Sequence, residues 1–246
     1  MIPKIIHYCW FGGNPLPVQA QKCIDSWKKY CPDYTIKQWD ETNFDLSYCT
    51  YVKEAVESKK WAFVTDVVRL YALFNEGGVY MDSDVEVLKP LDDILKYKAI
   101  SGFQDKDYIP TGIMASEKGH HLIKELLDQY NDIHFIKPDG SLDMTTNCVR
   151  ITDTLLAKGL VLNNTLQEVD EFTLFPLDYF CAKDVITGKV NITSNTYTIH
   201  HFAGSWTTAS NRRNTKIHCW FMRLFGEKIG TSIYNVIRKI KNRRKK

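Results

Sequence analysis

Two aspartates, Asp82 and Asp84, stand one residue apart after the short apolar run Val79-Tyr80-Met81. Carboxylates a few ångströms apart raise each other's pKa, so this acidic turn is either solvated or holds a cation. Carboxylate oxygens suit Mg²⁺ and Mn²⁺, which complete their shells with water and phosphate oxygens. The pair therefore predicts a cation site for a nucleotide diphosphate. A polar β-turn is the alternative interpretation, because Asp and Ser both favour turns.

A helix must precede this turn. Between Trp61 and Phe74 the apolar residues recur at three- and four-residue steps, which is typical of one helical stripe facing a core. Asp66 and Arg69 lie off that stripe, three residues apart, so both point the same way from the helix surface. Gly77-Gly78 ends the helix, since glycine adopts the left-handed cap conformation without a Cβ penalty. We expect a helix, a tight turn, a strand, the acidic turn and a second strand over 85–88.

The combined pattern is more specific than D-x-D alone. It resembles the sugar-nucleotide site of glycosyltransferase family 32, which includes bacterial capsular polysaccharide synthesis enzymes, and is similar to the site of the large clostridial glucosylating toxins. The matching residues are Thr65, Asp66, Arg69, Leu73, Gly77, Gly78, Tyr80, Asp82 and Asp84. The resemblance implies that Asp66 and Arg69 hold the donor sugar, that Asp82 contacts ribose and sugar, and that Asp84 ligates the metal. Tyr80 is implied to belong to the same nucleotide-sugar site.

The N-terminal segment predicts the fold class. Residues 2–11 read as a buried strand, 19–30 as a helix and 34–39 as a second strand, which together form a βαβ unit. We expect an α/β protein of the A-type glycosyltransferase fold, a Rossmann-like, mixed and mainly parallel sheet flanked by helices. The opening I-H-Y-C-W-F-G-G resembles that of the family, which implies that Trp10 stacks on the nucleobase. The alternative is that Trp10 is a core residue.

The stretch 196–206, TYTIHHFAGSW, carries two adjacent histidines at a predicted strand end. Successive strand side chains point to opposite faces, so only one of His200 and His201 can face a site. H-x-x-x-S-W resembles the C-terminal metal-binding signature of related retaining transferases and selects His201 as a metal ligand, with Ser205 and Trp206 on the diphosphate. Imidazole favours Mn²⁺ over Mg²⁺. An edge strand with an incidental histidine pair is the alternative.

Positively and negatively charged residues are unevenly distributed along the 246-residue chain. Residues 212–246 hold 12 Lys and Arg against one acid, Glu227, whereas the rest holds 20 against 28. Apolar residues at helical spacing accompany this charge, so we expect a catalytic domain over 1–210 and a basic amphipathic helical tail over 211–246. Such a tail suits an anionic membrane surface. Packing of the tail on the domain is the alternative. Nucleic acid is a rival partner, but no nucleic-acid-binding motif accompanies the tail.

The number and spacing of the cysteines indicate whether the protein is in a reducing or an oxidising compartment. Seven cysteines, an odd number without a C-x-x-C pair, argue against a zinc cage or a disulfide framework and favour a reducing compartment. No signal-peptide pattern and no run of about 18 apolar residues is apparent. We expect a cytoplasmic protein, peripheral on the inner face of a bacterial cell membrane.

The prediction is a metal-dependent retaining glycosyltransferase, using Mn²⁺ or Mg²⁺ and a nucleoside diphosphate sugar, with a UDP-hexose favoured. Its acceptor would be a saccharide, possibly lipid-linked, in capsular, exopolysaccharide or lipopolysaccharide synthesis. Asp66, Arg69 and Asp82 would carry the reaction. A non-catalytic sugar-nucleotide or membrane-surface binding protein is one alternative. A haloacid dehalogenase-type phosphatase is another, although that family has D-x-D on its first strand and here Glu86 stands where it has Thr or Val.

Overall fold

The computed structural model describes residues 1–204, 207 and 209–243. The strands are β1 (Ile5–Cys9), β2 (Thr35–Trp39), β3 (Gly78–Met81), β4 (Val85–Val87), β5 (Ala99–Gly102), β6 (Ile113–Ser116), β7 (Gln167–Val169), β8 (Phe172–Phe175) and β9 (Thr198–His200). The helices are α1 (Val18–Tyr30), α2 (Thr50–Glu57), α3 (Trp61–Glu76), α4 (His121–Asp128), α5 (Asn147–Ala157), α6 (Leu177–Phe180), α7 (Ala209–Phe225) and α8 (Glu227–Arg243), with a 3₁₀ turn η1 (Asp92–Ile94).

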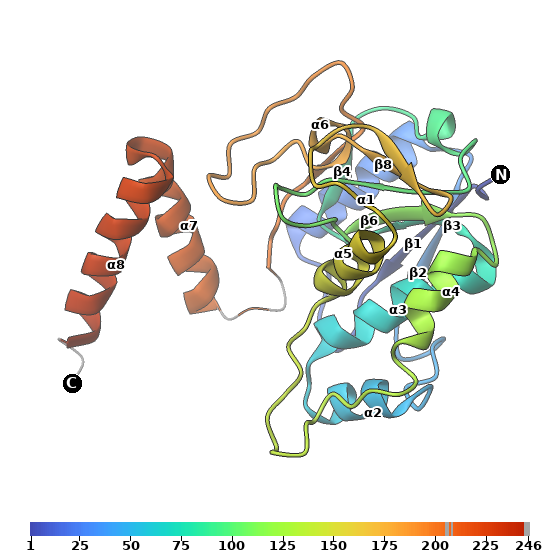
Figure 1. Cartoon of the computed structure of the whole chain (residues 1–246), viewed down its shortest axis with the longest axis horizontal. Coiled ribbons are helices and arrows are strands. Elements are labelled where there is room, and N and C mark those ends of the chain that lie inside the picture. Colours follow the sequence, from blue (N-terminus) through green and yellow to red (C-terminus); the bar gives the residue numbers. More distant parts are fainter. Residues whose placement is uncertain (205–206, 208, 244–246) are drawn as a thin grey trace.

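In the described chain, seven strands form one mixed sheet in the order β2-β1-β3-β6-β5-β8-β7 (Figure 1). β1 pairs in parallel with β2 and β3, and β5 pairs in parallel with β8, whereas β6 and β7 run against their neighbours. Five of these seven strands therefore run in one direction. The predicted βαβ unit and the mixed, mainly parallel α/β sheet are confirmed.

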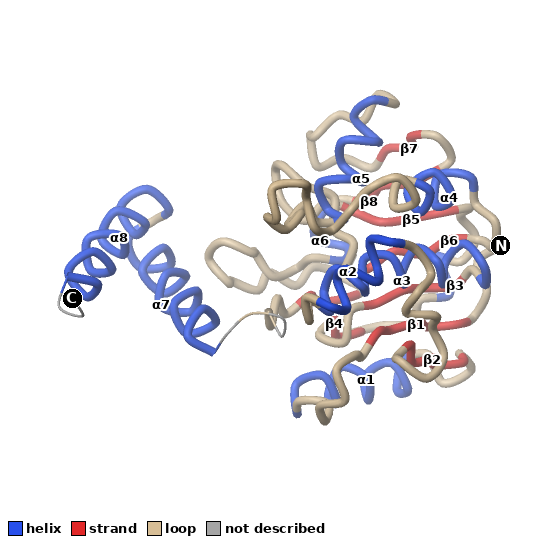
Figure 2. The backbone as a smooth tube through the Cα atoms, turned by 90° about the horizontal axis from the view of Figure 1, so that it is seen from below, coloured by secondary structure: helices blue, strands red, loops and turns tan. Residues whose placement is uncertain are grey.

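Apolar cores lie on both faces of this sheet. One core joins the sheet to α2, α3, α4 and α5, and the other joins it to α1, η1 and β4 (Figure 2). Strands β3, β5, β6 and β8 are buried along their whole length. Strands covered on both faces are rich in apolar residues, as these four are, with Ser101, Ser116 and Thr173 as the polar exceptions.

The helix before the acidic turn, α3, ends at Glu76, directly before Gly77-Gly78, as predicted. Gly77, with φ 69°, donates its N–H to the Leu73 carbonyl, and Gly78 has φ 107°. A Cβ on Gly78 would meet the Ile5 carbonyl oxygen at 2.6 Å. Glycine is required at this turn because β3 enters the sheet directly against β1.

A loop precedes strand β6. Residues 109–112 form a loop, and β6 starts only at Ile113. Pro110 has no N–H to give to a ladder, and the Thr111 carbonyl accepts a hydrogen bond from Arg69 at 2.6 Å instead of pairing with a strand. The loop thereby becomes part of the site described below.

A second, two-stranded sheet lies beyond the end of β3. β4 pairs antiparallel with β9, with Val85 opposite His200 and Glu86 opposite Ile199. The Trp27 indole of α1 donates to the Val85 carbonyl at 2.7 Å and fixes β4 on the domain. This sheet brings residues near 200 beside the acidic turn at 82–84.

The C-terminal helices α7 and α8 form a hairpin that stands apart from the main sheet (Figures 1 and 2). A Cβ on Gly230 of α8 would meet the Phe221 carbonyl oxygen of α7 at 2.6 Å, so the two helices pack closely. Arg223 of α7 donates to the Thr187 carbonyl at 3.1 Å. The division at residue 210 stays a prediction. Across the described helices, none combines the length and apolar character needed to cross a bilayer.

Candidate active site

One guanidinium links two of the predicted site carboxylates. Arg69 Nη2 lies 3.2 Å from Asp66 Oδ1 and 3.4 Å from Asp82 Oδ1. Nη1 of the same side chain donates to the carbonyl and the hydroxyl of Thr111, at 2.6 and 2.9 Å. Asp66 and Arg69 are both buried. The guanidinium thus brings α3 and the acidic turn together, and the buried charges of Asp66 and Arg69 are paired, as burial requires.

The Tyr80 side chain contacts both Asp82 and Arg69. Its hydroxyl donates to Asp82 Oδ1 at 3.0 Å, and the Arg69 guanidinium lies 4.7 Å from the centre of its ring. Only 1% of Tyr80 is exposed. The side chain therefore positions Asp82 and Arg69, while direct contact of Tyr80 with a donor stays a prediction.

Asp66 is held by a residue that the sequence did not single out. The Asn147 N–H donates to Asp66 Oδ2 at 3.1 Å, and the Asn147 side-chain amide donates to the Asp66 carbonyl at 2.6 Å. The Tyr130 hydroxyl donates to Asn147 Oδ1 at 2.5 Å, which fixes the orientation of the amide. Burial, opposed mainly by the charge of Arg69, raises the pKa of Asp66 to about 6.

The second half of the site is a cluster of two carboxylates and one imidazole. His200 Nε2 lies 3.3 Å from Asp84 Oδ1 and 3.9 Å from Asp82 Oδ2. A Cβ on Gly112 would lie 2.5 Å from the His200 ring and 2.9 Å from Asp82 Oδ2, so only glycine leaves room for both. Ligand atoms of these three side chains lie within 4.8 Å of one another. Two carboxylates and an imidazole fit Mn²⁺ or Mg²⁺, with the imidazole favouring Mn²⁺.

The charges in this cluster depend on each other. Burial opposes ionisation of Asp84, but the charge of His200 and its hydrogen bond lower the pKa of Asp84 to about 2. Burial likewise opposes a charged His200, yet the Asp84 carboxylate raises the pKa of His200 well above its usual range. The Ala203 N–H also donates to Asp84 Oδ2 at 2.6 Å.

The placement of His201 differs from the expectation. His201 Nε2 lies 2.8 Å from Glu86 Oε2, and it is His200 that faces Asp84. The register of the two-stranded sheet explains the difference. Glu86 lies opposite Ile199, and residues two apart on a strand share a face, so His201 joins Glu86. One histidine does look into the cluster, as predicted, but it is the other member of the pair.

Three further residues, Trp10, Ser205 and Trp206, are predicted to contact the donor. Trp10 is partly buried against the core, and its indole donates to the Asn14 carbonyl at 2.6 Å, so its role at the nucleobase stays a prediction. Ser205 and Trp206 lie outside the described residues.

A second histidine group lies near the start of α4, where His120 and His121 approach Glu171. His120 Nδ1 accepts the Leu122 N–H at 3.3 Å, which makes His120 the N-cap of the helix. The proton of the neutral ring is then on Nε2, the nitrogen left for a metal, so this group suits capping better than metal binding.

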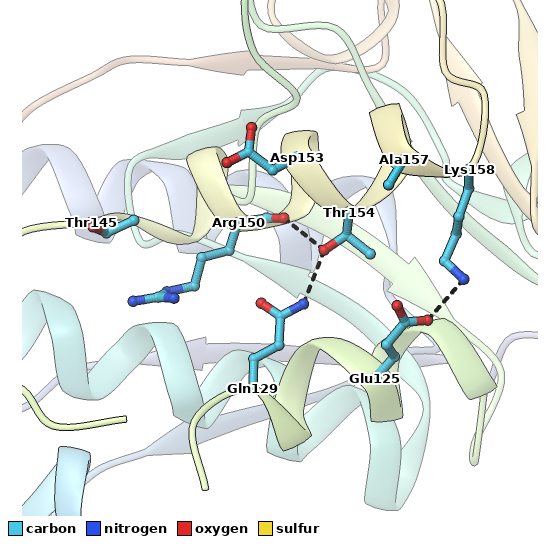
Figure 3. A pocket seen from close by; sticks show the side chains of 8 residues that line it. All are labelled: Glu125, Gln129, Thr145, Arg150, Asp153, Thr154, Ala157 and Lys158. Carbon is cyan, nitrogen blue, oxygen red and sulfur yellow. Dashed lines mark hydrogen bonds and ion pairs between the residues drawn. The ribbon is translucent and has the colours of Figure 1, made fainter. Parts of the chain in front are cut away.

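An open groove of about 580 Å³ runs between α4 and α5 (Figure 3). Gln129 donates to Thr154 at 3.0 Å and Lys158 pairs with Glu125 at 2.9 Å across it. The residues lining the groove include none of the carboxylates described above. The groove is therefore separate from the cluster of Asp66, Asp82 and Asp84.

Comparison with known proteins agrees with the resemblance noted in the sequence. Residues 17–100 match the family described as "Glycosyltransferase sugar-binding region containing DXD motif", a span that holds Asp66, Arg69, Asp82 and Asp84. The chain is 33% identical over 134 residues to inositol phosphoceramide mannosyltransferase 3 of Schizosaccharomyces pombe, covering 51% of this chain and 36% of the relative. It is 30% identical over 135 residues to mannosyl phosphorylinositol ceramide synthase CSH1 of Saccharomyces cerevisiae, covering 49% and 33%.

The chain thus spans about a third of the length of these curated relatives. Among solved structures, PaToxG glycosyltransferase aligns with a TM-score of 0.48 and 20% identity, over 64% of this chain and 69% of that one. The family match lies on the sequence segment that builds the carboxylate half of the site.

Proposed function

We propose that this protein, whose residues 17–100 carry a glycosyltransferase sugar-binding region with a D-x-D motif, transfers a hexose from a nucleoside diphosphate sugar to a saccharide acceptor. The observation that carries the proposal is the Arg69 guanidinium, which lies 3.2 Å from Asp66 and 3.4 Å from Asp82, beside the cluster of Asp82, Asp84 and His200. The carboxylates that would bind the sugar therefore lie next to the residues that would hold the cation for the diphosphate.

Each residue has a distinct task in the proposed reaction. Asp66 and Asp82 accept hydrogen bonds from sugar hydroxyls and orient the hexose. Arg69 keeps both carboxylates in place and stabilises negative charge on the departing diphosphate. Asp84, Asp82 and His200 would hold Mn²⁺ or Mg²⁺, which when bound supplies positive charge to the diphosphate. These residues position the donor and require no covalent chemistry from the protein.

Thiols near the site do not supply a nucleophile. Burial raises the pKa of Cys9 to about 12 and also raises the pKa of Cys148, so both stay protonated at neutral pH. Retention of anomeric configuration, which the family resemblance implies, would then proceed by front-side attack of the acceptor.

For the donor we favour a UDP-hexose, from the similarity to the clostridial toxins. The curated relatives are named as mannosyltransferases, which makes a mannosyl donor the second candidate. Their names also contain a phosphoceramide or ceramide lipid. A lipid-linked acceptor is consistent with those names, and we place it in capsular, exopolysaccharide or lipopolysaccharide synthesis.

The α7–α8 hairpin supports a cytoplasmic protein bound to the inner face of the cell membrane. Its exposed apolar side chains include Trp220, Leu224, Phe225, Ile229, Val236 and Ile237. The sequence over residues 212–246 carries 12 Lys and Arg. Apolar and cationic side chains together suit an anionic lipid surface.

The test is release of UDP or GDP from a panel of nucleotide hexoses, with Mn²⁺ or with EDTA. We expect slow hydrolysis of one donor that needs the metal, is lost in Asp84→Ala, and persists in Asp107→Ala, a surface aspartate on another loop. Binding without turnover would favour the non-catalytic alternative. If no donor is bound or cleaved with metal present, the proposed function is wrong.

A further inference from the structure

Lys183 lies between α6 and β9, on a segment that the predicted site did not include. The side chain is half-buried, and its ammonium donates to the His201 carbonyl. In the part of the chain that the structure describes, no carboxylate forms an ion pair with this ammonium. An ammonium has three N–H donors, so the single described acceptor leaves two of them for water or a ligand.

The loop that carries Lys183 is well ordered by its own hydrogen bonds. Lys183 forms a β-bridge with Val190, and the Asp184 N–H donates to the Lys189 carbonyl at 2.8 Å. The Asp184 carboxylate accepts the Ile186 N–H at 3.1 Å. From the other side, Arg223 of α7 donates to the Thr187 carbonyl at 3.1 Å. The position of Lys183 is therefore fixed by the fold.

Three contacts connect Lys183 to the acidic turn. The ammonium is bonded to the His201 carbonyl, the His201 N–H donates to the Asp84 carbonyl at 3.0 Å, and the Ala203 N–H donates to Asp84 Oδ2 at 2.6 Å. Burial lowers the pKa of Lys183, whereas the charge of Asp84 opposes that change. The ammonium is thus linked through the backbone of His201 to Asp84 of the cation site.

We propose that Lys183 is a contact residue for the diphosphate of the donor. This inference rests on the proposed function. In the transfer, the acceptor hydroxyl oxygen bonds to C1 of the hexose as the bond from C1 to the β-phosphate oxygen breaks. The electron pair stays on that oxygen, and the hydroxyl proton passes to the diphosphate or to water. Lys183 donates a hydrogen bond to the diphosphate, whose charge grows in this step.

The experiment compares Lys183→Met and Lys183→Arg with Lys189→Met, an exposed lysine on the same loop. Dissociation constants are measured with Mn²⁺ for the nucleoside diphosphate product of the wild-type reaction and for its monophosphate, together with donor hydrolysis rates. We expect Lys183→Met to weaken diphosphate binding on the order of tenfold to a hundredfold more than monophosphate binding. Lys183→Arg restores much of this loss, and Lys189→Met behaves as wild type.

Two results overturn the inference. Equal weakening of both nucleotides in Lys183→Met, with a lowered melting temperature, assigns Lys183 a structural role at the His201 carbonyl. Unchanged binding and hydrolysis in Lys183→Met show that the ammonium does not contact the donor, while wild-type turnover leaves the proposed function intact. If wild type itself neither binds nor cleaves any donor, the proposed function is wrong and this inference with it.

Discussion

Asn147 forms two hydrogen bonds with Asp66, from its backbone N–H to the carboxylate at 3.1 Å and from its side-chain amide to the main-chain carbonyl at 2.6 Å. The second bond locks the start of α5 onto the middle of α3. Asn147→Ala removes only the side-chain bond and leaves the Asp66 carbonyl and the Tyr130 hydroxyl with lost partners. The start of α5 is then held less tightly, so the Asn147 N–H that orients the Asp66 carboxylate is less firmly placed.

We expect Asn147→Ala to lower kcat/KM for donor hydrolysis by about tenfold or more, since a lost buried hydrogen bond costs about 1–3 kcal/mol. The measurement is steady-state kinetics, with unfolding in urea as a second readout. Asn131→Ala, an exposed asparagine after α4, is the matched control. Unchanged kinetics in Asn147→Ala would show that Asp66 needs no support from α5.

The raised pKa of Asp66 predicts a pH dependence of stability. Its pKa is about 6 in the folded chain, against an ordinary value of 3.8, because of burial. The folded state therefore holds the proton more tightly, so this contribution to stability is complete below pH 3.8 and is lost as the pH rises to 6. The loss is about 3 kcal/mol, at 1.36 kcal/mol for each pKa unit.

Asp66→Asn cannot titrate and should lack this component. We expect the difference in free energy of unfolding between wild type and Asp66→Asn to decline from pH 4 to pH 6 and then to stay level. Urea unfolding at several pH values measures it. Parallel curves for the two proteins across this range would mean that Asp66 titrates normally in the folded state.

Local spacing was enough to predict half of the site. Asp66 and Arg69 share a helix face because they are three residues apart, and Asp82 and Asp84 follow a glycine turn that fixes where β3 begins. The residues needed for these inferences all lie within 61–84. The structure of so short a segment depends mainly on helix periodicity, capping residues and turns, and all three can be recognised in the sequence.

The other residues come from distant parts of the chain. Asn147 meets Asp66 across 81 positions, and His201 meets Glu86 across 115. The choice between His200 and His201 depends on the register of β4 against β9, where a shift by one residue exchanges the two faces. No local pattern fixes that register. Lys183 likewise becomes visible only through its contact with the His201 carbonyl.

The C-terminal hairpin predicts binding of the full chain to anionic vesicles. We expect binding to phosphatidylglycerol-containing vesicles, weak binding to phosphatidylcholine alone, and loss of binding at high salt. Replacing Lys241, Arg244 and Lys246 by Gln should weaken binding at least tenfold, since each contributes on the order of 1 kcal/mol. Vesicle sedimentation measures the bound fraction.

Two further variants separate charge from apolar contact. In the first, the exposed body residues Lys22, Lys53 and Lys59 are replaced by Gln, which makes the same charge change away from the hairpin and should leave binding intact. In the second, Ile229→Ser removes an exposed apolar side chain of α8 and should weaken binding even at low salt. Equal effects of the C-terminal and body charge variants would refute a membrane role for the tail.

The two adjacent histidines give the sharpest test of the cation site. His200 Nε2 lies 3.3 Å from Asp84, whereas His201 Nε2 lies 2.8 Å from Glu86, outside the cluster. We expect His200→Ala to raise the dissociation constant for Mn²⁺ at least tenfold, because a ligand matters at least as much as its outer-shell partners. His201→Ala, the neighbouring residue with the same loss of volume, should change it much less. Isothermal titration calorimetry with Mn²⁺ decides between them, and the reverse order would restore His201 as the ligand. In that case the end of β9 would have to rotate when the metal binds. His200 and His201 are adjacent, so they point to opposite faces as long as β9 keeps its register against β4.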